Sequence, residues 1–249
     1  MAVFFKTILY QPIFNALVFL YNYLPGQDLG LAIIALTFLI RLVLLPLFYK
    51  SAKDQTIMQK LAPKIKAIQE SHKDDKQKQT LALLELYREH KVNPFSQFLL
   101  LFIQLPILIA LYRVFWQGIT EQTLANLYSF VSKPEILSHQ FLRLIDLGSR
   151  SWIIVGLAVV AQYFQGRLSL AKTDKLAKDL TAMERMSRQM VFVGPLMTIL
   201  FLSYLPAAVG LYWLTTSVFS IIQQIIINKK LTVSDDALIA IDKKLHHQQ

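Results

Sequence analysis

The run LGLAIIALTFLIRLVLLPLF, residues 29–48, decides the class of fold. A helix needs roughly 20 mostly apolar residues to cross a hydrocarbon core of about 30 Å, and this run has that length and composition. We therefore predict a transmembrane helix. Its one charged residue, Arg41, lies well inside the predicted span, where a charge is costly unless it meets water, an anion or other protein. Arg41 is thus the first candidate functional residue.

The composition extends the membrane prediction to the rest of the chain. Hydrophobic residues make up 54% of it, the mean hydropathy is +0.42, and the apolar residues come in blocks rather than in helical stripes. We predict an all-α, polytopic membrane protein with five transmembrane helices. The four further spans are residues 95–117, 152–165, 190–205 and 207–227. The third and fourth spans are short, which predicts untilted packing or a locally thinned bilayer.

Lysine and arginine are distributed unevenly between these spans. Residues 51–92 carry nine of them and residues 167–188 carry six, whereas residues 118–151 carry three, balanced by three acidic residues. The positive-inside rule then places the first two loops and the C-terminus in the cytosol and the N-terminus outside. The net charge of +10 suits orientation and contact with anionic lipid headgroups better than specific nucleic-acid binding.

The chain divides into three predicted parts. Residues 1–26 form an N-terminal interfacial amphipathic helix on the outer face, residues 27–228 the five-span core, and residues 229–249 a short cytosolic tail. We expect four side chains of the first part in the acyl boundary: Phe14, Leu17, Val18 and Tyr21. A sixth span, which would turn the N-terminus inward, is the alternative.

Residues 50–92 predict a cytosolic helical hairpin. Apolar residues at helical spacing mark one stripe on each arm: Ile57, Leu61, Ile65 and Ile68 on the first, and Leu81, Leu84 and Tyr87 on the second. The polar residues 72–75 mark the bend, Pro63 is expected to kink the first arm, and Asn93-Pro94 is a candidate cap for the second span. Either the two arms close on each other, or one stripe serves a partner or an arriving substrate.

Polar side chains inside the predicted spans lie on shared helix faces. Thr37 is one turn before Arg41, and Gln97 and Gln104 are seven residues apart. The fifth span carries a longer stripe: Trp213, Thr216, Ser217, Ser220 and Gln224. We predict that these faces and Arg41 line a wet, positively charged cavity. The alternatives are hydrogen bonding between helices for the hydroxyls and amides, and snorkelling of Arg41 to the inner interface.

The predicted spans lack the groups that most membrane enzymes and pumps require. No Asp, Glu or His lies deep within them, so intramembrane proteolysis, a zinc site and a carboxylate proton relay are not expected. The chain has no cysteine and no phosphate-binding glycine loop. We therefore predict no catalytic residues, no cofactor and no metal. A cationic groove of this kind would lower the cost of moving a short polar segment across the bilayer.

Several short motifs together resemble the YidC-type membrane protein insertase family. They are LTFLIR at 36–41 with Pro46 following, PKI at 63–65, DDKQ at 74–77, VNP at 92–94, QLPI at 104–107, LPAAVGLYW at 205–213 and QQ at 223–224. The resemblance runs from about Gln11 to Asn228 and keeps motif order and spacing. Each motif alone is weak, but the set is specific. The chain is most similar to the short form of the family, without a large periplasmic domain.

The resemblance implies an insertase core with a mobile cytosolic hairpin and a groove that opens to the cytosol and to lipid but is closed outside. Arg41 matches the groove arginine that draws in acidic residues of the substrate, Thr37 and Trp213 match positions that face its path, and Gln104 matches a groove position. It also implies a bacterial plasma membrane, nascent membrane proteins as clients, no nucleotide, and chaperone action beside the Sec translocon. The short tail of mixed charge argues against ribosome tethering through it, so ribosome contact would fall to the hairpin or to residues 167–188.

Two other functions fit the same residues. In an anion channel or carrier, Arg41 would be the selectivity site, and the path would have to cross both leaflets. The apolar outer half of the first span, residues 29–36, argues for a groove that is sealed outside. A passive assembly scaffold would leave the polar faces dry and would tolerate Arg41→Ala.

Overall fold

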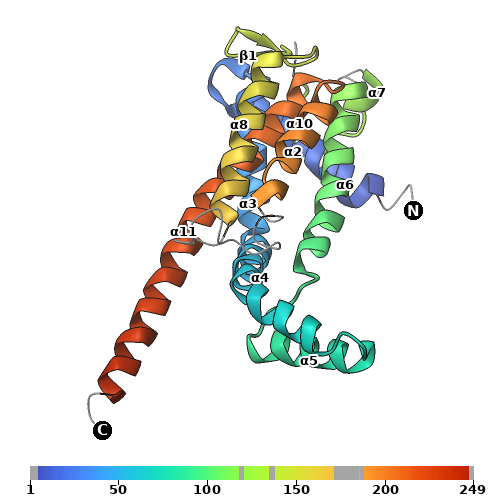
Figure 1. Cartoon of the computed structure of the whole chain (residues 1–249). Helices are drawn as coiled ribbons and strands as arrows, with labels where there is room; N and C mark the ends of the chain where they lie inside the picture. The colour runs from blue at the N-terminus through green and yellow to red at the C-terminus, as the bar shows by residue number, and fades with distance from the viewer. Residues whose placement is uncertain (1–4, 118–120, 135–137, 171–184, 186–187, 247–249) are drawn as a thin grey trace.

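The computed structural model describes residues 5–117, 121–134, 138–170, 185 and 188–246. The described chain is helical apart from one two-stranded hairpin, so the all-α prediction is confirmed. Figure 1 shows the helices grouped around α3, with α4 and α5 extending from one end and β1 at the other. The elements are η1 (Lys6–Tyr10), α2 (Gln11–Tyr23), η2 (Pro25–Gln27), α3 (Leu29–Val43), α4 (Leu45–Ser71), α5 (Lys76–Glu89), α6 (Ser96–Gln117), α7 (Glu121–Leu124), β1 (Gln140–Phe141), β2 (Ile145–Asp146), α8 (Trp152–Ser169), α10 (Val193–Leu202) and α11 (Ala207–His246).

Within the described residues, one helical segment, Ala207–Lys230 of α11, is by itself long and apolar enough to cross a membrane. The pair α3 and α4 passes the same test only when taken together, and residues Phe102–Val114 and Arg188–Leu202 form shorter apolar helices. The number of five spans therefore stays a prediction. The basic loop expected at 167–188 falls largely outside the described residues, and the expected tail, residues 229–249, continues α11 as helix to His246.

The first predicted span is not one straight helix. The chain bends by 72° between α3 and α4, so the run 29–48 is divided at Leu44, whose φ of −90° and ψ of 4° are not helical. Pro46 explains the break, because it has no N–H to donate to Leu42 and its ring would clash with that carbonyl in a continuous helix. Residues 45–48 thus belong to the first arm of the hairpin. That arm then continues as helix through Pro63.

The two arms of the hairpin pack against each other. The buried contact consists of Leu61 and Ile65 on α4 with Leu86 on α5 and the following Val92. The stripe expected on α5 was partly wrong: Leu81 and Leu84 are 60% and 46% exposed, and Leu83 packs inward instead. The sequence LALL at 81–84 offers apolar residues to more than one helix face, so spacing alone could not select the buried one.

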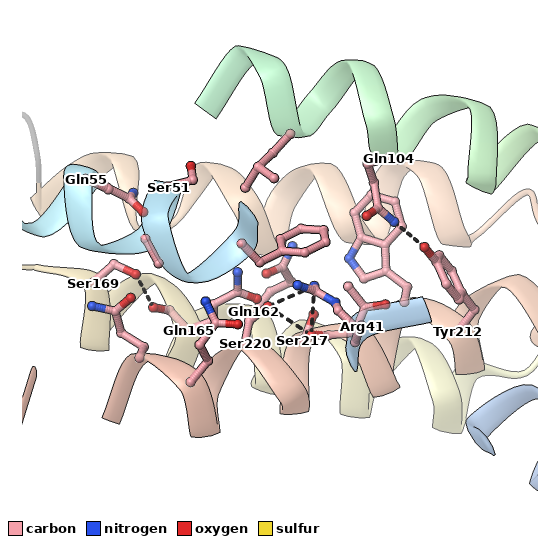
Figure 2. A pocket seen from close by; sticks show the side chains of 17 residues that line it. Arg41, Ser51, Gln55, Gln104, Gln162, Gln165, Ser169, Tyr212, Ser217 and Ser220 are labelled. Atoms are coloured by element: carbon pink, nitrogen blue, oxygen red, sulfur yellow. Dashed lines mark hydrogen bonds between the residues drawn. The ribbon is translucent and has the colours of Figure 1, made fainter. Parts of the chain in front are cut away.

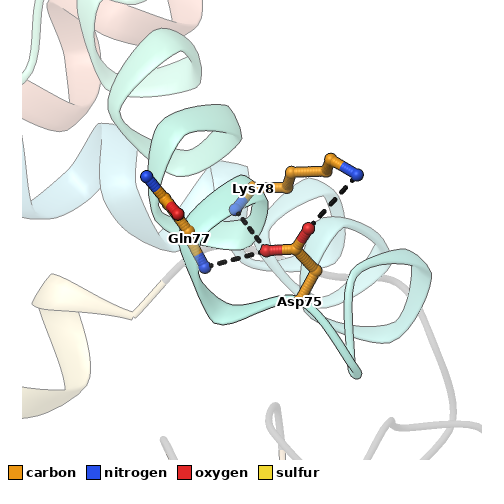
Figure 3. Close-up of polar contacts among 3 residues, drawn as sticks. All are labelled: Asp75, Gln77 and Lys78. Atoms are coloured by element: carbon orange, nitrogen blue, oxygen red, sulfur yellow. Dashed lines mark hydrogen bonds and ion pairs between the residues drawn. The ribbon is translucent and has the colours of Figure 1, made fainter.

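The bend of the hairpin is held by Asp75, which caps α5. One carboxylate oxygen accepts from the backbone N–H groups of Gln77 at 3.1 Å and Lys78 at 3.0 Å, and the other lies 3.2 Å from Lys78 Nζ (Figure 3). The hydrogen bonds from the backbone and side chain of Lys78 are the main cause that lowers the pKa of the exposed Asp75 carboxyl. Acceptance of the first N–H groups by an aspartate is the usual reason why a helix starts at such a residue.

The N-terminal helix α2 is built into the protein core. Phe14, Leu17, Val18 and Tyr21 are at most 1% exposed, so the expectation that they contact lipid was wrong. They pack in a cluster with residues of α3, α6 and α11. The buried Asn15 donates to the carbonyl of Asn126 at 3.0 Å and accepts from the N–H of Tyr128, which ties α2 to the segment after α7. An apolar helix face can be covered by protein as well as by lipid, and the sequence does not distinguish the two.

Backbone contacts join the starts of α3 and α11 to residues 138–151. Asp28 caps α3 by accepting from the N–H of Leu31 at 2.9 Å, and its second oxygen accepts from Leu142 at the tip of the β1–β2 hairpin. The N–H groups of Ala207 and Ala208 donate to the carbonyls of Ser149 and Leu147 at 2.8 and 3.0 Å. This end of the molecule is therefore closed by protein contacts.

The second predicted span begins later than expected. Asn93 accepts from the N–H of Phe95 at 2.9 Å, which forms a turn, and α6 starts at Ser96. The Oγ of Ser96 donates to the buried carboxylate of Asp54 on α4 at 2.6 Å. The base of the hairpin is thus attached to the first turn of α6.

Candidate functional site

A polar cavity of about 360 Å³ lies between α3, α4, α6, α8 and α11. Figure 2 shows its lining, with Arg41 near the middle and glutamine and serine side chains around it. The lining residues are Arg41, Phe48, Ser51, Ala52, Gln55, Leu100, Gln104, Gln162, Gln165, Ser169, Tyr212, Trp213, Thr216, Ser217, Ser220, Gln223 and Gln224. Arg41 is the one charged side chain among them.

The guanidinium of Arg41 is buried and held by neutral groups. Its Nη2 donates to Ser220 Oγ at 2.9 Å and to the backbone carbonyl of Thr216 at 3.2 Å. The ring of Phe48 lies over it with the centroid 4.0 Å from Cζ, and the ring of Phe219 is 5.7 Å away. Aromatic faces attract a cation, more strongly when it is desolvated. No ion pair to Arg41 is found among the described residues, so its charge is available to an incoming anionic group.

The bend at Leu44 is what brings Phe48 to Arg41. In a straight helix, residues seven apart lie about 10 Å apart along the axis. The 72° change of direction instead lets the Phe48 ring lie over the Arg41 guanidinium. The same bend directs Ser51 and Gln55 of α4 into the cavity.

The polar stripe expected on the fifth predicted span lies on α11 and lines the cavity. Trp213, Thr216, Ser217 and Ser220 follow one face of α11, and Gln224 extends it by one turn. Gln224 also donates from Nε2 to Thr56 Oγ1 on α4 at 3.0 Å. Ser220 and Gln224 therefore both bond a neighbouring helix and face the cavity.

Gln104 lines the cavity from α6 and donates to the hydroxyl of Tyr212 on α11 (Figure 2). The side chain of Gln97 lies outside the described residues. Thr37 does not line the cavity: it is 1% exposed and donates to the carbonyl of Ile33 at 2.6 Å. One helical turn separates it from Arg41, but α11 covers this part of α3 and leaves no open space beside the threonine.

Sequence reasoning missed the wall that α8 contributes. Gln162, Gln165 and Ser169 line the cavity from this helix. Their spacing of three and four residues places them on one helix face, so the signal was present in the sequence. It was missed because the expected span ended at Gln165, whereas α8 continues to Ser169. Tyr212 and Gln223 were missed as well. Each is adjacent in sequence to a residue of the predicted stripe, and adjacent residues of a helix project from different faces.

The lining has the chemistry of a binding surface for polar groups. Gln223 Oε1 is buried and finds no hydrogen-bond donor among the described residues. Such an orphaned acceptor in a polar cavity suits water or the N–H of an incoming chain. No cluster of His, Cys, Asp or Glu that could hold a metal occurs in the described part of the chain.

The helical architecture, the apolar α11 and a cavity lined by amides, hydroxyls and one arginine define a class: helical membrane proteins with a partly open polar cavity. The chain belongs to the YidC-type family described as 60Kd inner membrane protein, which matches residues 19–235. The resemblance read from the sequence motifs is thereby confirmed. This family is not one of catalytic enzymes.

Relatives with the name membrane protein insertase YidC share about a third of the residues. The protein of Fusobacterium nucleatum is 32% identical over 203 residues, which cover 82% of this chain and 87% of that protein. Those of Campylobacter jejuni and Wolinella succinogenes are 31% and 32% identical over 90% and 95% of this chain. The chain spans 38% and 40% of the length of these two relatives.

Proposed function

We propose that the protein is a membrane protein insertase and chaperone, and that the cavity around Arg41 receives the polar segment of a nascent membrane protein during transfer. The observation that carries the proposal is the buried Arg41 guanidinium, whose hydrogen-bond partners among the described residues are neutral and which faces a cavity with six glutamines. The names of the relatives support the same function.

The physical task is to lower the cost of moving polar groups through hydrocarbon. An amide or hydroxyl that loses its hydrogen bonds on leaving water costs roughly 2–7 kcal/mol, and a bare charge costs far more. The amide and hydroxyl side chains of the cavity replace part of those hydrogen bonds, and Arg41 attracts acidic side chains of the client. Apolar segments leave into lipid, where they are most stable, so no nucleotide is required.

The proposal includes a topology. The β1–β2 end lies outside, and the hairpin of α4 and α5 and the C-terminus lie in the cytosol, within a core of five spans over residues 27–228. The nine basic residues of 51–92 support this orientation. Clients are nascent membrane proteins, anionic lipids surround the protein, and the Sec translocon and the ribosome are candidate partners.

The packing supports insertion over anion conduction. Between the cavity and the β1–β2 end, the start of α3 carries the buried apolar side chains Leu29, Ile33 and Leu36, which pack in one cluster with residues of α2, α6 and α11. An ion path would have to cross this cluster, whereas an insertion groove need not. A passive scaffold would give no reason for an arginine in a polar cavity whose partners among the described residues are all neutral.

The test is protease protection of a small single-span substrate with an acidic tail, offered to liposomes that contain the purified protein. We expect protection with the wild type, strong loss with Arg41→Ala, and unchanged protection with Arg113→Ala, which removes an exposed arginine outside the cavity. A substrate with a neutral tail should depend less on Arg41. Wild-type protection no better than in empty liposomes, with chloride flux instead, would overturn the proposal in favour of a channel.

A further inference from the structure

The tip of the β1–β2 hairpin presents two leucines to the outside of the protein. Leu144 is 83% exposed and Leu142 is 53% exposed, with the exposed Arg143 between them. Leu142 and Arg143 adopt positive φ values of 51° and 60°. Such values are uncommon for residues other than glycine. A single exposed leucine needs no explanation, but this tip has a defined position relative to the helix ends.

Two contacts hold the tip level with the start of α3. The N–H of Leu142 donates to Asp28 Oδ2 at 2.5 Å, and Asp28 is also the cap of α3. Next to it, the ring of Phe141 packs directly on Gly30 in the first turn of α3. Because α3 opens the predicted first span, its first turn lies where the span meets the membrane surface. The tip therefore lies at that boundary as well.

Exposed aromatic side chains mark the same boundary on three other elements. Tyr23 at the end of α2, Trp152 at the start of α8 and Tyr204 just after α10 are 71%, 67% and 69% exposed. The end of α2, the start of α8 and the end of α10 lie toward the β1 end of the molecule (Figure 1), where Asp28 contacts Leu142 and Ala207 bonds Ser149. Tyrosine and tryptophan are enriched where a membrane protein crosses the headgroup region. The guanidinium of Arg150 lies 5.9 Å from the ring of Tyr204 and adds a positive charge at this level.

We propose that Leu142 and Leu144 insert into the headgroup and acyl boundary of the adjoining leaflet, with Arg143 on the lipid phosphates. The occupant is phospholipid because the tip lies beside the start of α3, and Trp152 and Ile153 at the start of α8 are 67% and 65% exposed at the same end of the molecule. Arg143 and Arg150 are complementary to anionic headgroups. The hairpin thus anchors the closed end of the molecule to the bilayer. The inference needs a membrane location but no particular client.

The test uses the absence of cysteine from the chain. Leu142→Cys, Leu144→Cys and Gln140→Cys are each labelled with the environment-sensitive dye NBD in liposomes of phosphatidylglycerol and phosphatidylethanolamine. Gln140 is the matched control, because it is exposed on the same hairpin. It lies two residues before Leu142 and pairs with Asp146 on β2. We expect blue-shifted emission at 142 and 144 and several-fold stronger quenching by lipids with a nitroxide near the headgroup. The label at 140 should respond mainly to aqueous iodide.

The proposal is overturned when the labels at 142 and 144 are as accessible to iodide as the label at 140, or when all three are quenched equally by the lipids. Nitroxide labels at the same positions, read by their accessibility to oxygen and to an aqueous nickel chelate, give a second measurement. Positions 142, 144 and 140 are exposed, and circular dichroism of each labelled protein verifies that it is folded. Insertion of a client is measured separately by protease protection, so failure of the lipid anchor can be distinguished from failure of the proposed function.

Discussion

Nη2 of Arg41 donates a hydrogen bond of 2.9 Å to Oγ of Ser220, which lies 179 residues further along the chain. The same nitrogen reaches the carbonyl of Thr216, which also accepts from Ser220 Oγ at 3.0 Å. The charge on α3 is therefore held by one turn of α11. Because the partners are neutral, the arginine is positioned without being neutralised.

Ser220→Ala is expected to loosen Arg41 without displacing it. The guanidinium keeps the Thr216 carbonyl and the Phe48 ring, so the free energy of unfolding should fall by about 1 kcal/mol, the typical value of one hydrogen bond. Thermal unfolding in detergent measures this. Ser203→Ala is the control, because its hydroxyl bonds only its own helix end. Equal losses in both variants would contradict the assigned bond.

The contact between Asp54 and Ser96 is expected to behave as a coupled pair. Ser96→Ala leaves the carboxylate of Asp54, which is 4% exposed, without its hydroxyl donor, and should cost about 1–3 kcal/mol. Replacing both partners with apolar residues, Asp54→Leu with Ser96→Ala, should cost less than the sum of the single changes. A double-mutant cycle of thermal stability measures the coupling. Additive costs would show that the two residues do not interact.

Gly30→Ala is expected to destabilise the closed end of the molecule. A methyl group at Gly30 would overlap the ring of Phe141, so either the β1–β2 hairpin or α3 must shift. In a protein that already carries Phe141→Ala, the additional change Gly30→Ala should cost much less stability than it does in the wild type. Gly156→Ala serves as the control, since nothing lies within 4 Å of its added carbon, and it should stabilise by roughly 0.5–1 kcal/mol. Destabilisation that persists without the ring would place the cause elsewhere.

Protonation of Asp75 is expected to weaken the bend of the hairpin. The folded state lowers the pKa of this carboxyl, so its contribution is present above the usual aspartate pKa of about 3.9 and is lost as the pH falls through the lower, folded value. Hydrogen-exchange protection factors of the Gln77 and Lys78 amides should fall in that range. Asp75→Asn keeps an acceptor but does not titrate. Identical acid sensitivity in this variant would exclude Asp75 as the cause.

Sequence patterns predicted the helices well where one physical signal dominated. Runs of about 20 apolar residues marked α6 and the first part of α11, and the polar residues 72–75 marked the bend before α5. The polar stripe from Trp213 to Gln224 was predicted because hydroxyls and amides at spacings of three and four share a helix face. Three expectations failed for a common reason: the buried face of α2, the inward side of α5 and the burial of Thr37 all depend on neighbouring elements. The straight first span failed for a local reason, because Pro46 breaks the helix at Leu44.

The sequence by itself determined the helical class, the membrane family and the isolation of Arg41, because hydropathy, charge and motif spacing are properties of the chain. Only the tertiary structure decided what surrounds Arg41. Phe48 reaches it through the bend, Gln162 and Gln165 reach the cavity from α8, and Ser220 reaches it from α11. These contacts join residues far apart in sequence, and they depend on how helix faces pack, which periodicity alone leaves open.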